Sequence, residues 1–151
     1  VPIIASGGIA DGRGLVAALA LGADGVNMGT RFCATVEAAI HENVKRKIVE
    51  NSELDTILVG RSLRNTTRVA KNLVSVAVAD IQRDPAAEFE KVKDLMSGQR
   101  ARDHVLRDGD MDGGVWTSGQ SQALVHDIPT CEDLVRRIMA QADGIRRSLA
   151  S

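Results

Sequence analysis

Residues 1–32 constrain the fold most strongly, because they have the pattern of a strand, a helix and a second strand. Residues 1–5 form a short apolar run rich in β-branched side chains, which is typical of a buried strand. Asp11 can cap a helix, apolar residues follow it at helical spacing, and Gly22 suits the end of that helix. Val26 and Met28 indicate the second strand. A helical crossover predicts parallel strands, whose C-terminal ends lie at one edge of the sheet.

Both predicted strands end at small residues that suit a phosphate site. Gly7 and Gly8 follow the first strand, and Gly29 follows the second. Glycine has no Cβ, so backbone N–H groups there can approach an anion closely, and the Thr30 hydroxyl and a helix beginning just after it add donors. In (β/α)8 barrels the phosphate cup lies in the loops after strands seven and eight. The alternative is that these glycines only form tight turns, as in any parallel α/β protein.

The stretch from residue 6 to residue 32, SGGIADGRGLVAALALGADGVNMGTRF, resembles the FMN phosphate-binding end of the nitronate monooxygenase family. Its first half is shared with inosine monophosphate dehydrogenase and other flavin or phosphate barrels. The continuation MGTRF, the segment CATVEA and the later WTSGQSQALVHDIPT narrow the resemblance to nitronate monooxygenases and the related 2-enoyl reductases. The resemblance implies FMN as the cofactor. It places the cofactor against Ser6, Gly7, Gly8, Asn27, Met28, Gly29, Thr30 and Gln120.

Residues 115–121 are the second informative stretch, a glycine-bearing segment before an apolar helix start. In the resembled family a GQ segment of this kind lies over the flavin, so Gln120 is expected to contact the cofactor and Ser121 the substrate. An amide and a hydroxyl can hold the pyrimidine edge of a flavin or a nitro oxygen. The alternative is that Ser118 or Ser121 caps a helix, a position that serine favours. We expect Gln120 and Ser121 at the same mouth of the barrel as the glycine turns.

The resemblance implies an α/β fold, namely the C-terminal portion of a TIM-type (β/α)8 barrel with additional helices. A full barrel takes about 250 residues, whereas this chain has 151 residues and begins at Val1. We therefore expect the C-terminal part of a single FMN-binding barrel domain over residues 1–151. Its expected parts are a phosphate-binding βαβ unit at 1–32, a helical segment at 33–108, and an active-site loop with the C-terminal helix at 109–151.

The expected activity is that of an FMN-dependent oxidoreductase that oxidises alkyl nitronates, with oxygen, to a carbonyl compound and nitrite. Enzymes of the resembled family use a histidine base at the end of an earlier strand, and none of His41, His104 and His126 matches that motif. No catalytic residue is therefore expected within this chain, and the isolated chain is expected to be inactive. Two kinds of alternative stay open. One is a flavin-dependent enoyl reductase or a phosphate-binding dehydrogenase of the inosine monophosphate dehydrogenase type, and the other is a non-catalytic half-barrel binding module.

Hydrophobic spacing predicts helices over 33–51, 69–81, 86–96 and 132–149. Asp84 and Pro85 mark a boundary, and Thr130 with Asp133 resembles a capping box. The arginine-rich stretch 61–71 either contacts an anion or the flavin edge, or is a solvated positive patch, and we favour the patch because the stretch lacks the glycines that cradle an anion. The acidic loop 109–114 lacks the EF-hand spacing, so no metal site is predicted.

The composition argues against several classes of partner. A net charge of −1 gives no indication of nucleic acid or an anionic membrane, and with 2% aromatic residues there is little to stack on bases. The sequence has no apolar run of about 18 residues, so no membrane span is predicted. The two cysteines lack metal-ligand spacing and are interpreted as free thiols of a cytoplasmic protein. A small-molecule nitronate and oxygen are the expected partners, and a homo-oligomer stays open.

Overall fold

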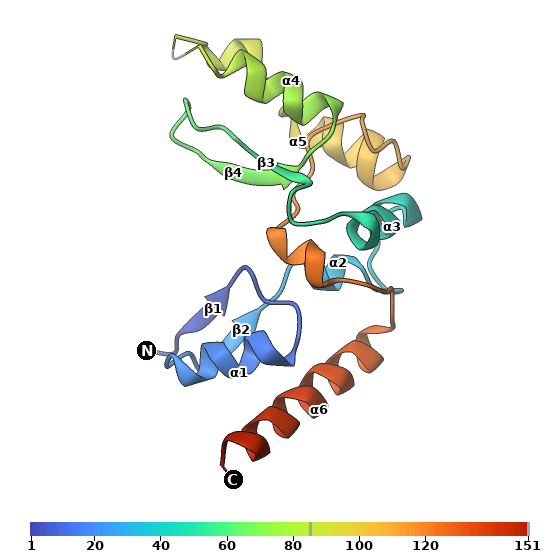
Figure 1. The fold of residues 1–151 in the computed structure, drawn as a ribbon. Helices are drawn as coiled ribbons and strands as arrows, with labels where there is room; N and C mark the ends of the chain where they lie inside the picture. Colours follow the sequence, from blue (N-terminus) through green and yellow to red (C-terminus); the bar gives the residue numbers. More distant parts are fainter. Residues whose placement is uncertain (85, 151) are drawn as a thin grey trace.

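A computed structural model describes residues 1–84 and 86–150, so Pro85, half of the predicted boundary, lies outside the described residues. The chain forms two lobes (Figure 1). The lower lobe contains β1 (Ile4–Ser6), α1 (Gly12–Ala20), β2 (Gly25–Asn27) and α6 (Cys131–Leu149). The upper lobe contains β3 (Thr56–Val59), β4 (Thr67–Ala70), α4 (Leu73–Ile81) and α5 (Gly98–Arg100). Between the lobes lie α2 (Thr30–Cys33) and α3 (Glu42–Glu50), and a core around Trp116 joins them.

The predicted strand–helix–strand unit is confirmed. Strands β1 and β2 are parallel, with Ile4 opposite Gly25, so both strands end at the same edge of their sheet. Asp11 caps α1, because its side chain accepts hydrogen bonds from the N–H groups of Arg13 and Gly14. Gly22 has a φ of +97°, which explains why a glycine follows the helix.

Helix α6 packs along α1 and holds it against the sheet. The Gly12 N–H, one of the free donors at the start of α1, donates to Oε1 of Gln141 at 2.7 Å. Leu134 and Ile138 of α6 form a buried cluster with Met28, the residue that follows β2. The Thr130 side chain accepts from the Asp133 N–H at the start of α6, as the sequence predicts.

The single helix predicted over 33–51 is wrong. The chain forms the one-turn α2, leaves helical geometry, and re-enters it at α3, which His41 caps by accepting from the Asn43 N–H. Tertiary hydrogen bonds hold the intervening backbone away from a helix: the Val36 N–H donates to the Pro129 carbonyl, and the His41 N–H to the Leu106 carbonyl. Local spacing could not reveal these partners, because they come from distant parts of the chain.

The segment 33–108, expected to be helical, also contains an antiparallel strand pair. Strands β3 and β4 pair with Thr56 opposite Ala70, so the helix predicted over 69–81 begins only at α4. Asn72 and Ser75 form a reciprocal capping box that starts this helix. Val69, counted in the sequence as part of a helical stripe, instead lies in β4 and is 2% exposed. Its β-branched side chain favours a strand over a helix, and the pairing with β3 provides the strand partner.

The helix predicted over 86–96 is also wrong, because only a short 3₁₀ turn (Phe89–Lys91) forms there. Val92 is buried, whereas Phe89 is 48% exposed, so the predicted apolar face is only partly packed against the rest of the protein. A short amphipathic segment without full tertiary packing does not form a stable helix. Beyond α5, a π-helix (Ala101–Arg107) follows, and the loop predicted over 109–114 is confirmed.

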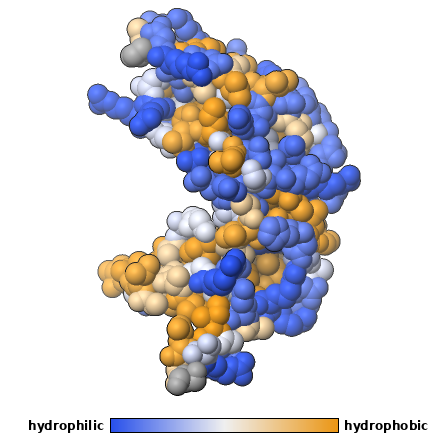
Figure 2. Space-filling view, in the orientation of Figure 1, coloured by the Kyte–Doolittle hydropathy of each residue, from blue (hydrophilic) through white to orange (hydrophobic). Residues whose placement is uncertain are grey.

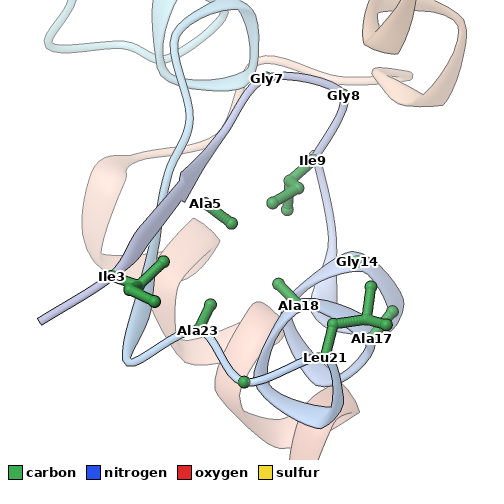
Figure 3. A pocket seen from close by; sticks show the side chains of 11 residues that line it. Ile3, Ala5, Gly7, Gly8, Ile9, Gly14, Ala17, Ala18, Leu21 and Ala23 are labelled. Atoms are coloured by element: carbon green, nitrogen blue, oxygen red, sulfur yellow. The ribbon is translucent and has the colours of Figure 1, made fainter.

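The lower lobe exposes apolar surface beside its small sheet. A hollow of about 470 Å³ lies between β1 and α1, lined by Ile3, Ala5, Ala18 and Leu21 among others (Figure 3). Figure 2 shows orange, hydrophobic residues gathered on this lobe and a hollowed side between the two lobes. None of the helices formed by residues 1–84 and 86–150 has the length and apolar character that a membrane crossing requires.

Candidate functional site

A cavity of about 420 Å³ lies at the C-terminal ends of β1 and β2. Its wall includes Ser6, Gly7, Gly8, Asn27, Met28, Gly29, Thr30 and Ser121, which are the predicted site residues with the exception of Gln120. The upper lobe and the segment before the 3₁₀ helix (Gln120–Leu124) add Thr66, Thr67, Arg68, Thr117, Ser118 and Gly119. The structure therefore brings together two glycine turns and a loop from near the other end of the chain.

The first glycine turn needs glycine for its backbone. Gly7 and Gly8 have φ values of +91° and +75°, in the left-handed region that side chains disfavour. A Cβ built on either residue would meet no heavy atom within 4 Å, so the space beside them is open. The Asn27 side chain donates to Ser6 Oγ at 3.2 Å, which links the ends of the two strands.

Gly29, in the second turn, has no such conformational reason to be glycine. Its φ is −87°, which any residue adopts, and a Cβ there would meet no heavy atom within 4 Å. Neither backbone strain nor packing explains the missing side chain, so the open space itself is the distinctive feature. Helix α2, which begins just after Gly29, has only four residues, so its dipole adds little to this position.

Thr30 connects the glycine turns to the later loop. The Gly119 N–H donates to Thr30 Oγ1 at 2.9 Å, across 89 residues of sequence. The hydroxyl therefore accepts this bond and keeps its own hydrogen to donate to a ligand. The loop is fixed at its other side as well, because Thr117 pairs with Val69 of β4. We call Gly7, Gly8, Gly29 and Thr30 the glycine cup.

Gln120, one of the predicted cofactor residues, does not line the cavity. It is exposed and begins the 3₁₀ helix, while the buried glutamine is Gln122. Gln122 Oε1 accepts from the Ser118 hydroxyl at 2.6 Å, and its amide nitrogen donates to the Ser52 carbonyl at 2.6 Å. Gln122 thus anchors the loop, a role that sequence reasoning missed because nothing local marks its distant partner. The capping alternative is wrong as well, because Gly119 occupies the cap position and no side chain bonds there.

Arg68 is a residue for which the favoured sequence interpretation was wrong. It belongs to the arginine-rich stretch interpreted as a solvated patch, yet it lines the cavity and is only partly exposed. Its Nη1 donates to Thr56 Oγ1 of β3 at 2.8 Å. Among the described residues it has no carboxylate partner, and the wall of the cavity contains no carboxylate, imidazole or thiol. The cavity is therefore suited to an anion, and its described wall offers no side chain that could act as a general base.

Arg31, within the MGTRF motif, has a structural role. It is 4% exposed, and its guanidinium donates to the Asp127 carboxylate, the Asp127 carbonyl and the Ala34 carbonyl. Burial raises the pKa of Asp127, but hydrogen bonds and charges from Arg137 and Arg31 outweigh it and hold that pKa below its ordinary value. The pair ties the second turn to the segment before α6.

The chain is similar in sequence to known proteins over most of its length. The nitronate monooxygenase family model matches residues 1–141. The chain is 31% identical to 5-hydroxy-7a-methyl-1-oxo-octahydro-1H-indene-4-carboxyl-CoA dehydrogenase of Rhodococcus jostii (strain RHA1), over 97% of this chain and 51% of that protein. It is 30% identical to a nitronate monooxygenase of Paraburkholderia phytofirmans, over 97% of this chain and 40% of that protein.

Among solved structures, FabK from Thermotoga maritima superposes with a TM-score of 0.88 at 35% identity, over 99% of this chain and 47% of that one. This likeness confirms the α/β fold, while the complete barrel stays a prediction. The chain spans about half the length of the curated relatives it matches.

Proposed function

Because the chain belongs to the nitronate monooxygenase family, we propose that its glycine cup binds the phosphate of FMN in a flavin-dependent oxidoreductase. Gly29 is the observation that carries this proposal. It lacks a side chain where neither its φ of −87° nor its neighbours require that, and the space it leaves belongs to the cavity. A ligand that approaches the backbone closely accounts for the glycine.

The residues present fit a phosphate. The glycine cup offers backbone N–H groups beside open space, and Thr30 keeps a hydroxyl hydrogen to donate. The described wall of the cavity contains no carboxylate that would repel an anion. Gly7, Gly8, Gly29 and Thr30 would hold the phosphate, with Ser6, Asn27 and Met28 beside them.

FMN, when bound, would supply the redox chemistry. The proposed reaction oxidises an alkyl nitronate to a carbonyl compound and nitrite, with oxygen as the second substrate. The Ser121 hydroxyl faces the same cavity and has no hydrogen-bond partner among the described residues, so it is free to donate to a nitro oxygen. None of the chain's three histidines lines the cavity, so the proposal assigns no base to this chain.

A second candidate reaction is the oxidation or reduction of an acyl-coenzyme A. It is favoured by the relative in Rhodococcus jostii, which is named as a carboxyl-CoA dehydrogenase and is 31% identical over 97% of this chain. The glycine cup would hold the same flavin in either reaction. The two candidates differ only in the substrate that approaches it.

The test is a pair of substitutions at Gly29. Gly29→Val should lower the affinity for FMN by about tenfold or more, since one lost hydrogen bond to a charged group costs about 1.5–3 kcal/mol. Replacing glycine at a helix cap should cost at most about 1 kcal/mol of folding stability. Gly29→Ala should have a smaller effect on FMN in the same direction, because it adds a single methyl group.

Gly98→Ala is the matched control. Gly98 also has open space around a built Cβ and begins a short helix, but it does not line the cavity. The readouts are flavin absorbance after reconstitution and the midpoint of thermal unfolding without flavin. If Gly29→Val retains the full FMN content of the unmodified protein, the glycine cup does not hold the phosphate.

A further inference from the structure

We propose that Gly119 is a positioning residue that holds the hydroxyls of Thr30 and Ser121 in place for two different ligands. This inference rests on the proposed function, because Thr30 is assigned there to the FMN phosphate and Ser121 to the substrate. Gly119 lines the same cavity, on the segment that leads into the 3₁₀ helix. It joins the cofactor side of the cavity to the substrate side.

The backbone of Gly119 does not require a glycine. Its φ of −88° and ψ of 160° are extended values that other residues adopt readily. Gly119 occupies the cap position of the 3₁₀ helix. A serine, threonine, asparagine or aspartate would serve at a helix cap at least as well. The missing side chain therefore needs another explanation.

The atoms around Gly119 supply that explanation. A Cβ built on this residue would lie 3.3 Å from Thr30 Oγ1 and 3.3 Å from Ser121 Oγ, which is closer than ordinary van der Waals contact. The next heavy atom, the Ser121 nitrogen, would be 3.9 Å away. Because both oxygens lie 3.3 Å from one point, they are at most 6.6 Å apart, twice that distance. A side chain at this position would therefore crowd both hydroxyls at once.

The backbone of Gly119 also orients the first of these hydroxyls. Its N–H donates to Thr30 Oγ1 at 2.9 Å, so the hydrogen of the Thr30 hydroxyl cannot point along that bond and is directed away from the Gly119 nitrogen. The Gly119 carbonyl accepts from the Gln122 N–H at 3.0 Å. Both polar backbone groups of Gly119 are therefore engaged, which fixes the direction of the N–H that meets Thr30.

The loop around Gly119 is held on both sides and does not retreat to make room for a side chain. Thr117 pairs with β4. The Ser118 hydroxyl donates to Gln122 Oε1, and the Gln122 amide donates to the Ser52 carbonyl, both at 2.6 Å. A methyl group at position 119 therefore displaces the two crowded hydroxyls, because each ends a short side chain that turns about a single bond. This rotation costs little folding stability, but it moves both hydroxyls out of position.

The experiment measures the affinity of Gly119→Ala for FMN, and for ethylnitronate at saturating FMN without oxygen, by isothermal titration calorimetry. Each ligand should bind about two- to tenfold more weakly, the range for one misplaced hydrogen bond. In a Thr30→Val background the substitution should have no further effect on FMN, and in a Ser121→Ala background no further effect on ethylnitronate. Such non-additivity shows that Gly119 acts through the two hydroxyls, because a general loss of structure would weaken binding in every background.

Gly114→Ala is the matched control. Gly114 lies five residues earlier in the same loop, and a Cβ there would lie 3.1 Å from Ala101 Cα and 3.2 Å from the Ala101 nitrogen. Neither residue lines the cavity. Gly114→Ala should therefore lower the midpoint of thermal unfolding and leave both affinities unchanged, which is the reverse of the result expected for Gly119→Ala.

The outcomes separate this inference from the proposed function. Unchanged affinity of Gly119→Ala for either ligand overturns the inference, and so does a loss that persists in the matching Thr30→Val or Ser121→Ala background. Failure of the unmodified protein to bind FMN overturns the proposed function instead. A protein that binds FMN but not ethylnitronate overturns the substrate role of Ser121, and with it this inference, while the glycine cup stands.

Discussion

Replacing Gly12 should separate α1 from α6 and destabilise the protein. A Cβ at this position would lie 2.6 Å from the Ile138 carbonyl oxygen, 2.7 Å from the Ala142 nitrogen and 2.8 Å from Gln141 Cβ. Two of these atoms are backbone, so a rotamer change cannot relieve the clash. Carbon atoms in favourable contact stand about 3.5–4.0 Å apart, so Gly12→Ala requires the helices to move apart by roughly 0.7–1 Å.

The cost follows from two losses. Forcing a methyl group into a well-packed contact costs about 1–3 kcal/mol. The Gly12 N–H bond to Gln141 stretches at the same time, and a typical hydrogen bond contributes about 0.5–1.5 kcal/mol. The greater helix propensity of alanine offsets at most about 1 kcal/mol. A net loss of about 1–3 kcal/mol corresponds to a fall of roughly 3–10 °C in the unfolding midpoint for a protein of this size.

The assay is urea unfolding followed by far-UV circular dichroism. Gly144→Ala is the control, because Gly144 lies on α6, the helix that packs against α1, and a Cβ there would meet no heavy atom within 4 Å. This variant should leave the stability unchanged or raise it. A Gly12→Ala variant within about 0.5 kcal/mol of the unmodified protein would refute the argument, because an ordinary surface substitution costs no more than that.

Two further outcomes test individual side chains. Ser121→Ala should weaken nitronate binding by no more than about tenfold and leave the unfolding midpoint unchanged, because its hydroxyl has no partner in the described chain and one contact contributes about 0.5–1.5 kcal/mol. Unchanged nitronate affinity with a lower midpoint would show a purely structural role. The pKa of Asp127 is lower in the folded protein than in the unfolded chain, where it is about 3.9. Asp127 therefore stabilises the fold fully at pH values above about 3.9, and this stabilisation is lost as the pH falls through the lowered pKa. Urea unfolding from pH 6 to pH 2 should therefore show a shallower loss for Asp127→Asn, and parallel curves would contradict this.

The sequence was sufficient for the features that depend on neighbouring residues. Asp11 caps α1 through the N–H groups of residues two and three positions away, and Gly22 takes a positive φ directly after that helix. The same local logic placed Gly7 and Gly8 at the end of the first strand. Because parallel strands end at one edge of a sheet, the sequence also predicted that the two glycine turns would meet.

Only the tertiary structure decided the features that depend on distant partners. The pairing of β4 with β3 turned Val69 from a predicted helix into a strand and carried Arg68 into the cavity. The hydrogen bonds of Gln122 buried that residue and left Gln120 at the surface. Hydrophobic periodicity in the sequence does not predict such contacts, because they form between residues that are distant in the chain and become neighbours only in the folded protein.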